Sequence, residues 1–320
     1  MKAMTFTSPG PPPVFRSVEI EKPVPKDDEV LVKVYATSVN SWDWELTRKK
    51  PSGVYLGKRA NPKYRIMGAD VAGVVEGVGK DITRFKLGDE VFGDLCKSGW
   101  GGYAEYVCAT EEALTPKPSF MTFEEAAATP QAGLLALQGL HKFGRIKPDR
   151  RILINGAGGG VGSFAIQIAK LYGAEVTGVD SAEKSDFMRS LGADYVIDYK
   201  KEDFTDSRQQ YDLIIDMKGD RSISAYKRSL RPKGRCFLVG GKMSVMLKAA
   251  FFGSFGSKKV KLFLYKPNEN LDILTDFIKI GKVKPMIDRL YPLTDIAAAI
   301  RYLGEGRVKG KVVISLALKA

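Results

Sequence analysis

The stretch that decides the fold is Ile152-Leu153-Ile154-Asn155-Gly156-Ala157-Gly158-Gly159-Gly160-Val161-Gly162. An apolar strand-like run leads directly into a run of glycines, and the segment Ser163–Tyr172 after it has helical composition, with Gly173 as its end. This strand–turn–helix order is typical of a dinucleotide site, because glycines let the backbone approach a pyrophosphate and the helix N-terminus offers free N–H groups. We therefore predict that the cofactor contacts Gly156, Gly159, Gly160, Val161 and Gly162.

An acidic residue follows at a distance that suits a ribose contact. The glycine spacing, Gly156-x-x-Gly159-x-x-Gly162, departs from the usual G-x-G-x-x-G, and a glycine run alone also fits a flexible turn. Asp180 directly follows the next predicted strand, 18 positions after Gly162. A carboxylate there binds a ribose 2′-hydroxyl and repels a 2′-phosphate, which favours NAD. Lys184 and Arg189 lie just beyond and either attract such a phosphate or belong to an ordinary solvated helix face.

The chain changes character near residue 120. Before that point, short β-branched segments (30–35, 70–79, 88–93 and 102–107) alternate with Gly and Pro turns, which indicates a barrel or sandwich. After it, strands alternate with helices, which indicates a parallel doubly wound sheet. The strands predicted in this part are 151–155, 175–179, 195–198, 211–216, 235–239 and 259–264. Helices are expected over 123–141 with a break at Pro130, over 268–280 and over 294–303, and a last strand over 310–315 returns to the first part.

Composition limits the chemistry. The 320 residues suggest about two domains, and 44% hydrophobic with 27% charged residues are ordinary globular values. With one histidine, His141, and three cysteines, a His-rich metal site and a disulfide framework are excluded. The net charge of +13 permits nucleic-acid binding, but the basic residues are spread along the chain, so we do not expect it. We expect a cytoplasmic protein, or one inside an organelle, because neither a signal-peptide core nor a long apolar span is present.

Several segments together resemble a known family. They are 36–43 (ATSVNSWD), 68–75 (GADVAGVV), 84–91 (RFKLGDEV), the glycine turn 156–162 and 190–199 (SLGADYVIDY). They are similar to the zinc-independent medium-chain dehydrogenase/reductases, in the quinone oxidoreductase and enone reductase branch, over nearly the whole chain. The resemblance implies an α/β fold in which a doubly wound Rossmann sheet (123–265) is inserted in a GroES-like β-barrel domain (1–122 plus 266–320). It also implies a homodimer that forms through the Rossmann domain.

The metal ligands of the zinc members of this superfamily are missing. Those members carry Cys where this chain has Asn40, and Gly-His-Glu where it has Gly68-Ala69-Asp70. The four-cysteine loop of their structural zinc site is also absent, because Phe92-Gly93 runs within a few residues into Gly99-Trp100-Gly101-Gly102. With one histidine and three cysteines neither site can be built, so we expect no bound metal.

Without a metal, hydrogen-bond donors must stabilise the charge that develops on the substrate oxygen. A conjugated acceptor makes this easier, so the expected reaction is hydride transfer from NAD(P)H to a quinone or to the C=C bond of an α,β-unsaturated carbonyl. Asn40, at the position of a missing ligand, is expected to donate to the acceptor oxygen, and Asp43 to orient a ribose hydroxyl or a water; both residues also fit a simple turn. Trp42, Trp44 and Tyr55 form either an aromatic wall of the site or ordinary packing.

The resemblance also implies cofactor contacts. Thr129 is expected near the nicotinamide, and Lys184 and Tyr199 match positions that bind the 2′-phosphate in NADPH-dependent members, whereas Asp180 replaces the small residue usual there. We therefore expect NADPH or NADH, with a lean to NADPH. Gly240 and Gly241, after the fifth strand, either let the backbone approach the same ring or form a βα turn.

Two alternatives stay open. The apolar and basic segment Met243–Tyr265 fits contact with an anionic membrane surface, or a substrate-side loop followed by an edge strand that pairs across a dimer. The resemblance favours the dimer. For the whole protein, the alternative to an enzyme is a cofactor-binding protein of the same fold with little turnover, which acts through RNA, membrane or partner binding.

Overall fold

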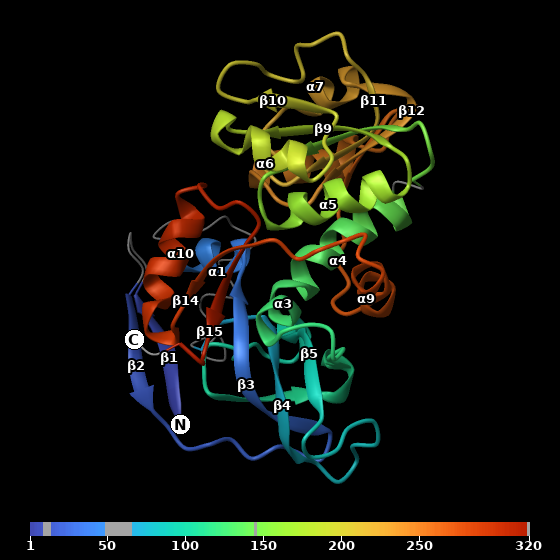
Figure 1. Cartoon of the computed structure of the whole chain (residues 1–320). Coiled ribbons are helices and arrows are strands. Elements are labelled where there is room, and N and C mark those ends of the chain that lie inside the picture. Colours follow the sequence, from blue (N-terminus) through green and yellow to red (C-terminus); the bar gives the residue numbers. More distant parts are fainter. Residues whose placement is uncertain (9–13, 49–65, 144–145, 319–320) are drawn as a thin grey trace. The chain divides into compact units, whose positions relative to one another are not determined.

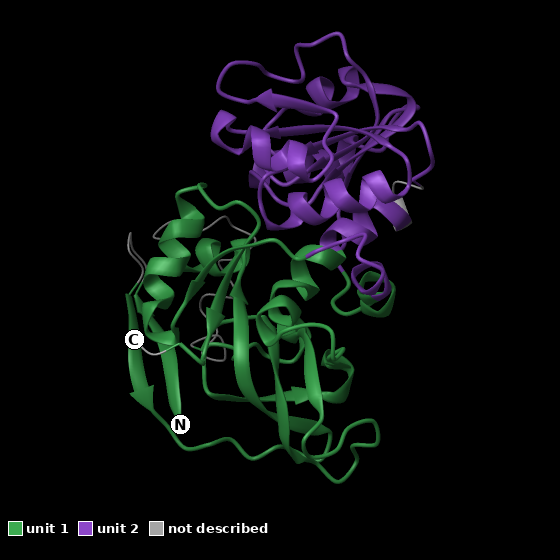
Figure 2. Cartoon of the chain, in the orientation of Figure 1, with its two compact units in different colours: residues 1–134, 266–275, 285–320 green, residues 135–265, 276–284 purple. Residues whose placement is uncertain are grey.

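The computed structural model describes residues 1–8, 14–48, 66–143 and 146–318. It divides into two compact units (Figure 2). Unit 1 comprises 1–134, 266–275 and 285–320, and unit 2 comprises 135–265 and 276–284. The first boundary lies at Leu134, later than the predicted residue 122, because the buried alanines of α3 (Phe123–Ala128) pack against strands of unit 1.

Unit 1 is built on a seven-stranded sheet, accompanied by the two-stranded hairpin of β1 and β2 (Figure 1). The sheet order is β14-β15-β3-β4-β5-β7, with β6 also paired to β3. The strands of unit 1 are β1 (Lys2–Ser8), β2 (Val14–Glu19), β3 (Glu29–Val39), β4 (Asp70–Val78), β5 (Glu90–Asp94), β6 (Tyr106–Thr110), β7 (Thr115–Pro116), β14 (Ile287–Tyr291) and β15 (Lys311–Ser315). β15 runs antiparallel to β3, with Val312 opposite Val39, so the expected return of the last strand is confirmed.

The helices of unit 1 are α1 (Ser41–Thr47), α3 and α10 (Ile296–Gly304), while α4 (Pro130–Gln138) and α9 (Leu271–Lys279) each cross a boundary between the units. α1 forms where a turn was considered from sequence. The backbone N–H of Asn40 donates to Asp43 Oδ2 at 2.8 Å, a contact typical of a helix start. α1 and α10 pack together, and Trp44 lies so close to Gly304 that a Cβ there would meet the indole at 2.5 Å.

Unit 2 is a parallel six-stranded sheet with the order β10-β9-β8-β11-β12-β13. Its strands are β8 (Arg151–Asn155), β9 (Glu175–Asp180), β10 (Tyr195–Asp198), β11 (Tyr211–Asp216), β12 (Leu230–Leu238) and β13 (Lys259–Leu262). Its helices are α5 (Gly160–Leu171), α6 (Ser185–Ser190), α7 (Ile223–Arg228) and α8 (Met243–Phe252). The chain winds outward from β8 in one direction and then resumes at β11 on its other side. This is the predicted doubly wound sheet, and ligands bind such sheets at the carboxyl ends of the strands where the winding reverses.

The segment after β12 begins with a helix, α8, where a loop was expected from sequence. Its Met, Leu, Lys and Ala residues are all good helix formers, which accounts for the difference. β13, which follows it, pairs with β12 and lies at the end of the strand order, so it is an edge strand as expected. Within the described parts of the chain, every helix is too short or too polar to span a bilayer.

Candidate functional site

The glycine turn of unit 2 joins β8 to α5. Gly156, with φ at +89°, and Ala157 both donate their N–H groups to the Val179 carbonyl, which ties the turn to β9. A Cβ on Gly162 would lie 2.4 Å from the Gly156 carbonyl oxygen, so the turn itself requires this glycine. A Cβ on Gly159, the N-cap of α5, would meet only that same oxygen, at 3.5 Å. The turn therefore leaves open space at Gly159, beside the first N–H groups of α5, and a phosphate fits this arrangement.

The carboxyl ends of β8 and β11 meet where the winding reverses. Asn155 pairs with Asp216 in the sheet register, and its Nδ2 donates to Asp216 Oδ1 at 3.0 Å. The same oxygen accepts the N–H groups of Lys218 and Gly219, and Oδ2 accepts the Tyr226 hydroxyl at 2.7 Å. Asp216 thus shapes the loop after β11. It was missed from sequence, although a carboxylate at the end of a buried strand was visible there.

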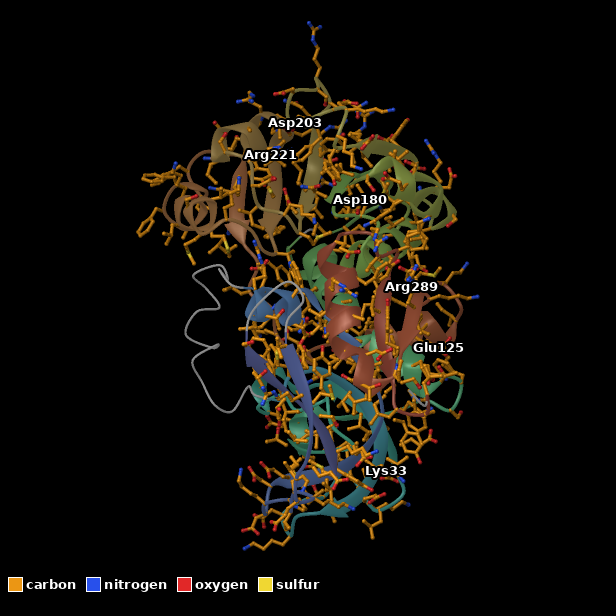
Figure 3. The ribbon with its side chains drawn as sticks, turned by 90° about the vertical axis from the view of Figure 1, so that its left-hand side faces the viewer. Lys33, Glu125, Asp180, Asp203, Arg221 and Arg289 are labelled. Atoms are coloured by element: carbon orange, nitrogen blue, oxygen red, sulfur yellow. The ribbon has the colours of Figure 1, made fainter. Side chains whose placement is uncertain are left out.

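Asp180, the last residue of β9 (labelled in Figure 3), is hydrogen-bonded to the turn. Its Oδ2 accepts the Gly158 N–H at 3.0 Å, and its Oδ1 accepts the Ser181 N–H at 2.9 Å and lies 3.2 Å from Lys184 Nζ. Both charged side chains are at most 10% exposed. The two oxygens predicted to bind a ribose hydroxyl are therefore already bonded within the protein, and Lys184 neutralises the charge that was expected to repel a 2′-phosphate. Tyr199 is half-exposed, and its N–H donates to the Asp180 carbonyl.

Gly240 and Gly241 form the turn after β12. Gly241 has φ at +138°, and a Cβ on it would lie 2.4 Å from the Gly219 carbonyl oxygen. The close packing of the loops that follow β11 and β12 thus explains this glycine without a ligand. A Cβ on Gly240 would meet nothing nearer than the Met217 oxygen, at 3.6 Å, so that position does leave room.

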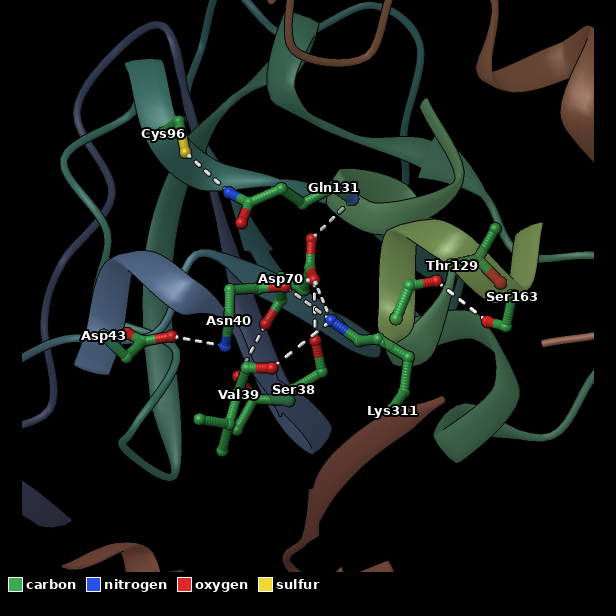
Figure 4. A network of polar contacts seen from close by, with 12 residues as sticks. Ser38, Val39, Asn40, Asp43, Asp70, Cys96, Thr129, Gln131, Ser163 and Lys311 are labelled. Carbon is green, nitrogen blue, oxygen red and sulfur yellow. Dashed lines mark hydrogen bonds and ion pairs between the residues drawn. The ribbon is translucent and has the colours of Figure 1, made fainter. Parts of the chain in front are cut away.

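A buried polar network in unit 1 joins Asn40 to residues from distant segments (Figure 4). Asp70 Oδ2 accepts hydrogen bonds from Ser38 Oγ at 2.6 Å and Asn40 Nδ2 at 2.9 Å. Lys311 Nζ donates to Asn40 Oδ1 at 2.5 Å and lies 3.5 Å from Asp70 Oδ2. Burial lowers the pKa of Lys311, and the neighbouring carboxylate of Asp70 opposes this shift. The network therefore holds an ammonium group and a carboxylate on either side of the Asn40 amide.

Asp43 adds a second carboxyl group to the buried part of unit 1. Burial raises the pKa of Asp43 to about 7, although the Asn40 N–H, the Tyr103 hydroxyl and the Lys311 charge all favour its ionised form. The structure therefore places Asp43 beside Asn40 as a fully buried carboxyl group. A group that orients a ribose hydroxyl or a water has to face solvent, and Asp43 does not.

The start of α4 contributes to the same network. The backbone N–H of Gln131 donates to Asp70 Oδ1 at 3.0 Å, and Gln131 Nε2 donates to Cys96 Sγ at 3.3 Å. Thr129 is fully buried, and its hydroxyl donates to the Glu125 carbonyl within unit 1. Gln131 was not singled out from sequence, because only the fold brings it next to Asp70.

Of the two alternatives for the aromatic residues, a wall of the site or ordinary packing, Trp42 and Trp44 show packing contacts. The rings of Trp42 and Trp100 lie 6.0 Å apart, and Trp44 contacts Gly304 on α10. Tyr55 lies outside the described residues.

No group of three or more His, Cys, Asp or Glu side chains in the described residues is arranged to hold a metal ion. Ala69, which stands where the zinc enzymes have a histidine, is buried and carries no donor. The single histidine, His141, places Nε2 2.5 Å from the Tyr172 hydroxyl in unit 2. The polar network around Asn40 thus offers amide, hydroxyl, carboxyl and ammonium groups.

Two family models match the chain. They are the "Alcohol dehydrogenase GroES-like domain", over residues 26–119, and "Zinc-binding dehydrogenase", over residues 191–314. The first falls in unit 1, and the second covers parts of both units.

Known proteins of similar sequence include quinone and enone reductases. The chain is 35% identical to the chloroplast envelope quinone oxidoreductase homolog of Arabidopsis thaliana, over 93% of this chain and 92% of that protein. It is 33% identical to the chloroplastic NADPH-dependent alkenal/one oxidoreductase of the same plant, over 98% of this chain and 79% of that protein. The crystal structure of Escherichia coli quinone oxidoreductase with NADPH is similar at a TM-score of 0.85 and 25% identity, over 98% of this chain and 100% of that one.

A larger side chain at Gly159 tests whether a phosphate occupies this space, because the fold has room for a Cβ at this position. Gly159→Leu places a side chain where a phosphate fits, and we expect it to raise the Kd for the cofactor by about a hundredfold or more. Loss of the glycine N-cap lowers the free energy of unfolding by only about 1 kcal/mol. Cofactor binding is measured by fluorescence titration and stability by urea denaturation.

The matched control is Gly162→Ala, whose Cβ would collide with the Gly156 carbonyl oxygen. It should lower the free energy of unfolding far more than Gly159→Leu does. A Gly159→Leu protein that binds the cofactor with unchanged affinity would show that phosphate does not occupy this turn.

The raised pKa of Asp43 predicts a pH dependence of stability. The folded protein keeps a proton on Asp43 up to about pH 7, whereas an unfolded Asp loses it near pH 4. Folding therefore binds a proton between about pH 4 and pH 7, and the free energy of unfolding contributed by Asp43 falls as the pH rises through this window. We expect wild type to lose on the order of 1 kcal/mol per pH unit relative to Asp43→Asn. Parallel stability curves for the two proteins from pH 4.5 to 7.5 would contradict the assignment.

Proposed function

Because the chain belongs to the quinone oxidoreductase and enone reductase branch of the medium-chain dehydrogenase/reductases, we propose that it transfers a hydride from NAD(P)H to a quinone or to the C=C bond of an α,β-unsaturated carbonyl. The observation that carries this proposal is that the chain contains a dinucleotide turn, in unit 2, and a polar network around Asn40, in unit 1, and that no cluster of metal-ligating side chains is found among the described residues. When bound, the reduced nicotinamide supplies the hydride. The residues of this chain bind the cofactor, orient the acceptor and stabilise its oxygen.

We propose that the reaction proceeds without zinc. Asn40 and Ala69 offer no thiolate or imidazole at the positions where zinc relatives have them. An amide N–H then takes over the stabilisation of the oxygen that becomes negative as the hydride arrives. Conjugated acceptors suit such a site, because the negative charge they gain is delocalised.

The cofactor preference we propose is NADPH. Gly159 and the N-terminus of α5 fit the pyrophosphate of either dinucleotide. The charge of Asp180 is compensated by Lys184, so the acid that would discriminate against a 2′-phosphate has lost most of that effect. The NADPH of the Escherichia coli relative and the NADPH dependence stated for the plant relative point the same way.

We also propose a homodimer that forms through unit 2. β13 is an edge strand, and the helix and loop before it expose large apolar side chains, which are Leu247, Phe251, Phe252 and Phe255. Phe251 is 69% exposed and Phe255 67%, and a monomer rarely leaves several such side chains together in water. A second copy of the edge strand would complete the sheet and cover them. The cytoplasmic location stays a prediction.

Turnover tests the function directly. We expect loss of the reduced-cofactor absorbance when a quinone or a short-chain enone is added, faster with NADPH than with NADH, and unchanged after dialysis against a chelator. Stoichiometric zinc in the active protein would contradict the metal-free mechanism. Cofactor binding without oxidation by either acceptor would favour the cofactor-binding alternative.

Light scattering on a sizing column tests the dimer. We expect wild type to have twice the 35.2 kDa chain mass, and Phe251→Glu with Phe255→Glu to have the mass of one chain, because the charges oppose burial of this surface. The matched control is Leu87→Glu, which replaces another exposed apolar side chain, 65% exposed, in unit 1. A wild-type protein that elutes as a monomer at micromolar concentration would contradict the proposal.

A further inference from the structure

The orientation of the Asn40 amide is determined by its neighbours. Lys311 forms an ion pair with Asp70 at 3.5 Å, and as an ammonium group its Nζ has only hydrogens to offer. It donates to Asn40 Oδ1 at 2.5 Å, so this atom must be the amide oxygen. Asp70 Oδ2 accepts from Asn40 Nδ2 at 2.9 Å, so that atom must be the nitrogen. A flipped amide would set oxygen against a carboxylate and NH₂ against an ammonium group. The Asp70–Lys311 pair therefore permits one orientation only.

This arrangement leaves Asn40 with one unused donor. The amide nitrogen carries two hydrogens, and Asp70 accepts one of them. The described residues provide no acceptor for the second. Asn40 is 6% exposed, compared with 3% for Lys311 and 0% for Asp70, so the network comes closest to the surface at Asn40.

The positive charge of Lys311 strengthens that donor. A hydrogen bond from an ammonium group draws electron density toward the amide oxygen, which makes the N–H hydrogens of the same amide more positive. The effect acts in a region where nearly all neighbouring side chains are buried, so water screens it little.

We propose that Asp70 and Lys311 are positioning residues that aim and polarise the Asn40 amide, so that its second N–H donates to the oxygen of the acceptor during hydride transfer. This inference rests on the proposed function. The hydride brings its electron pair to the β-carbon of the enone, the C=C pair shifts toward the carbonyl, and the oxygen becomes an enolate oxygen. A solvent proton then bonds to the α-carbon, while the nicotinamide is left oxidised. Asn40 stabilises the oxygen and transfers no proton.

The first experiment compares kcat and KM for Lys311→Met, a substitution that keeps the length of the side chain and removes its charge. We expect kcat with an enone to fall roughly tenfold or more, with KM for NADPH changed less than about twofold, because loss of an oxyanion donor lowers kcat by up to about 10²–10³. We expect a smaller loss with a quinone, because its anion is more delocalised and needs the donor less. A purely structural role would lower both activities equally.

A second readout is independent of turnover. 4-Nitrophenol, bound in the presence of oxidised cofactor, mimics the enolate oxygen, and its anion absorbs visible light. Wild type should bind it with a larger ionised fraction than water gives at the same pH, and Lys311→Met should reduce that fraction. An equal ionised fraction in the two proteins would overturn the inference. Wild type without turnover of either acceptor would overturn the proposed function instead, and this titration would still decide the positioning role.

Lys311→Met leaves the Asp70 carboxylate buried without a cation, so a double variant separates folding from positioning. Asp70→Asn with Lys311→Met removes both charges together, and the new amide at position 70 can donate to Asn40 Oδ1 and turn that amide around. We expect unfolding close to that of wild type but a kcat as low as in Lys311→Met. Recovery of the enone activity in the double variant would overturn the inference.

The matched control is Lys117→Met. Lys117 is another lysine of unit 1 with a buried side chain, which is 4% exposed and has its Nζ 2.9 Å from Glu90, but it lies outside the network. It should keep the enone-to-quinone activity ratio of wild type. The same change of ratio in Lys117→Met and Lys311→Met would show that any buried lysine of unit 1 matters equally, and would overturn the inference.

Discussion

Unit 1 depends on how one carboxylate is satisfied in its interior. Asp70 is fully buried, and an unpaired charge there would cost several kcal/mol, on the order of 3–5 when one partner is removed. Its oxygens are bonded by Ser38 on β3, Asn40 at the start of α1, Gln131 on α4 and Lys311 on β15. Satisfying this one side chain therefore brings three regions that are far apart in the sequence, around residues 38–40, 131 and 311, to the same point, and the candidate oxygen-binding amide belongs to the first of them.

In unit 2, the partners of a buried carboxylate are close to it in the sequence. Asp180 accepts hydrogen bonds from the N–H of Gly158 in the turn and from the N–H of Ser181, the next residue in the chain. It also forms an ion pair with Lys184, four residues further along. The acid thereby becomes a support for the turn rather than a surface charge. The open position at Gly159 then offers the first N–H groups of α5, and the nearby charge of Asp180 is compensated by Lys184.

Sequence patterns predicted local structure well and distant contacts poorly. β8, β10 and β11 run over the predicted residues. β8 and β11 are buried parallel strands, which are continuous apolar runs with clear ends, whereas β10 is a partly exposed edge strand. α1 was missed, because Asn40 and Asp43 fit a turn as well as a helix start. Asn40 was predicted from sequence to be a site residue, but Lys311 was not. Its role follows from the pairing of β15 with β3, and no local spacing records a contact between residues so far apart.

The origin of β15 has a consequence for how the molecule is made. During synthesis, β3 and β4 leave the ribosome early, then all of unit 2 follows, and Lys311 comes after both. Unit 2 contains its own turn, acid and lysine, so it has all its parts for folding while translation continues. Until Lys311 has been synthesised, the charge of Asp70 in unit 1 lacks the cation with which it pairs in the folded protein. The nascent chain thus completes the unit with the glycine turn first and the network around Asn40 last, which makes unit 1 the half that needs protection from aggregation until translation has passed residue 311.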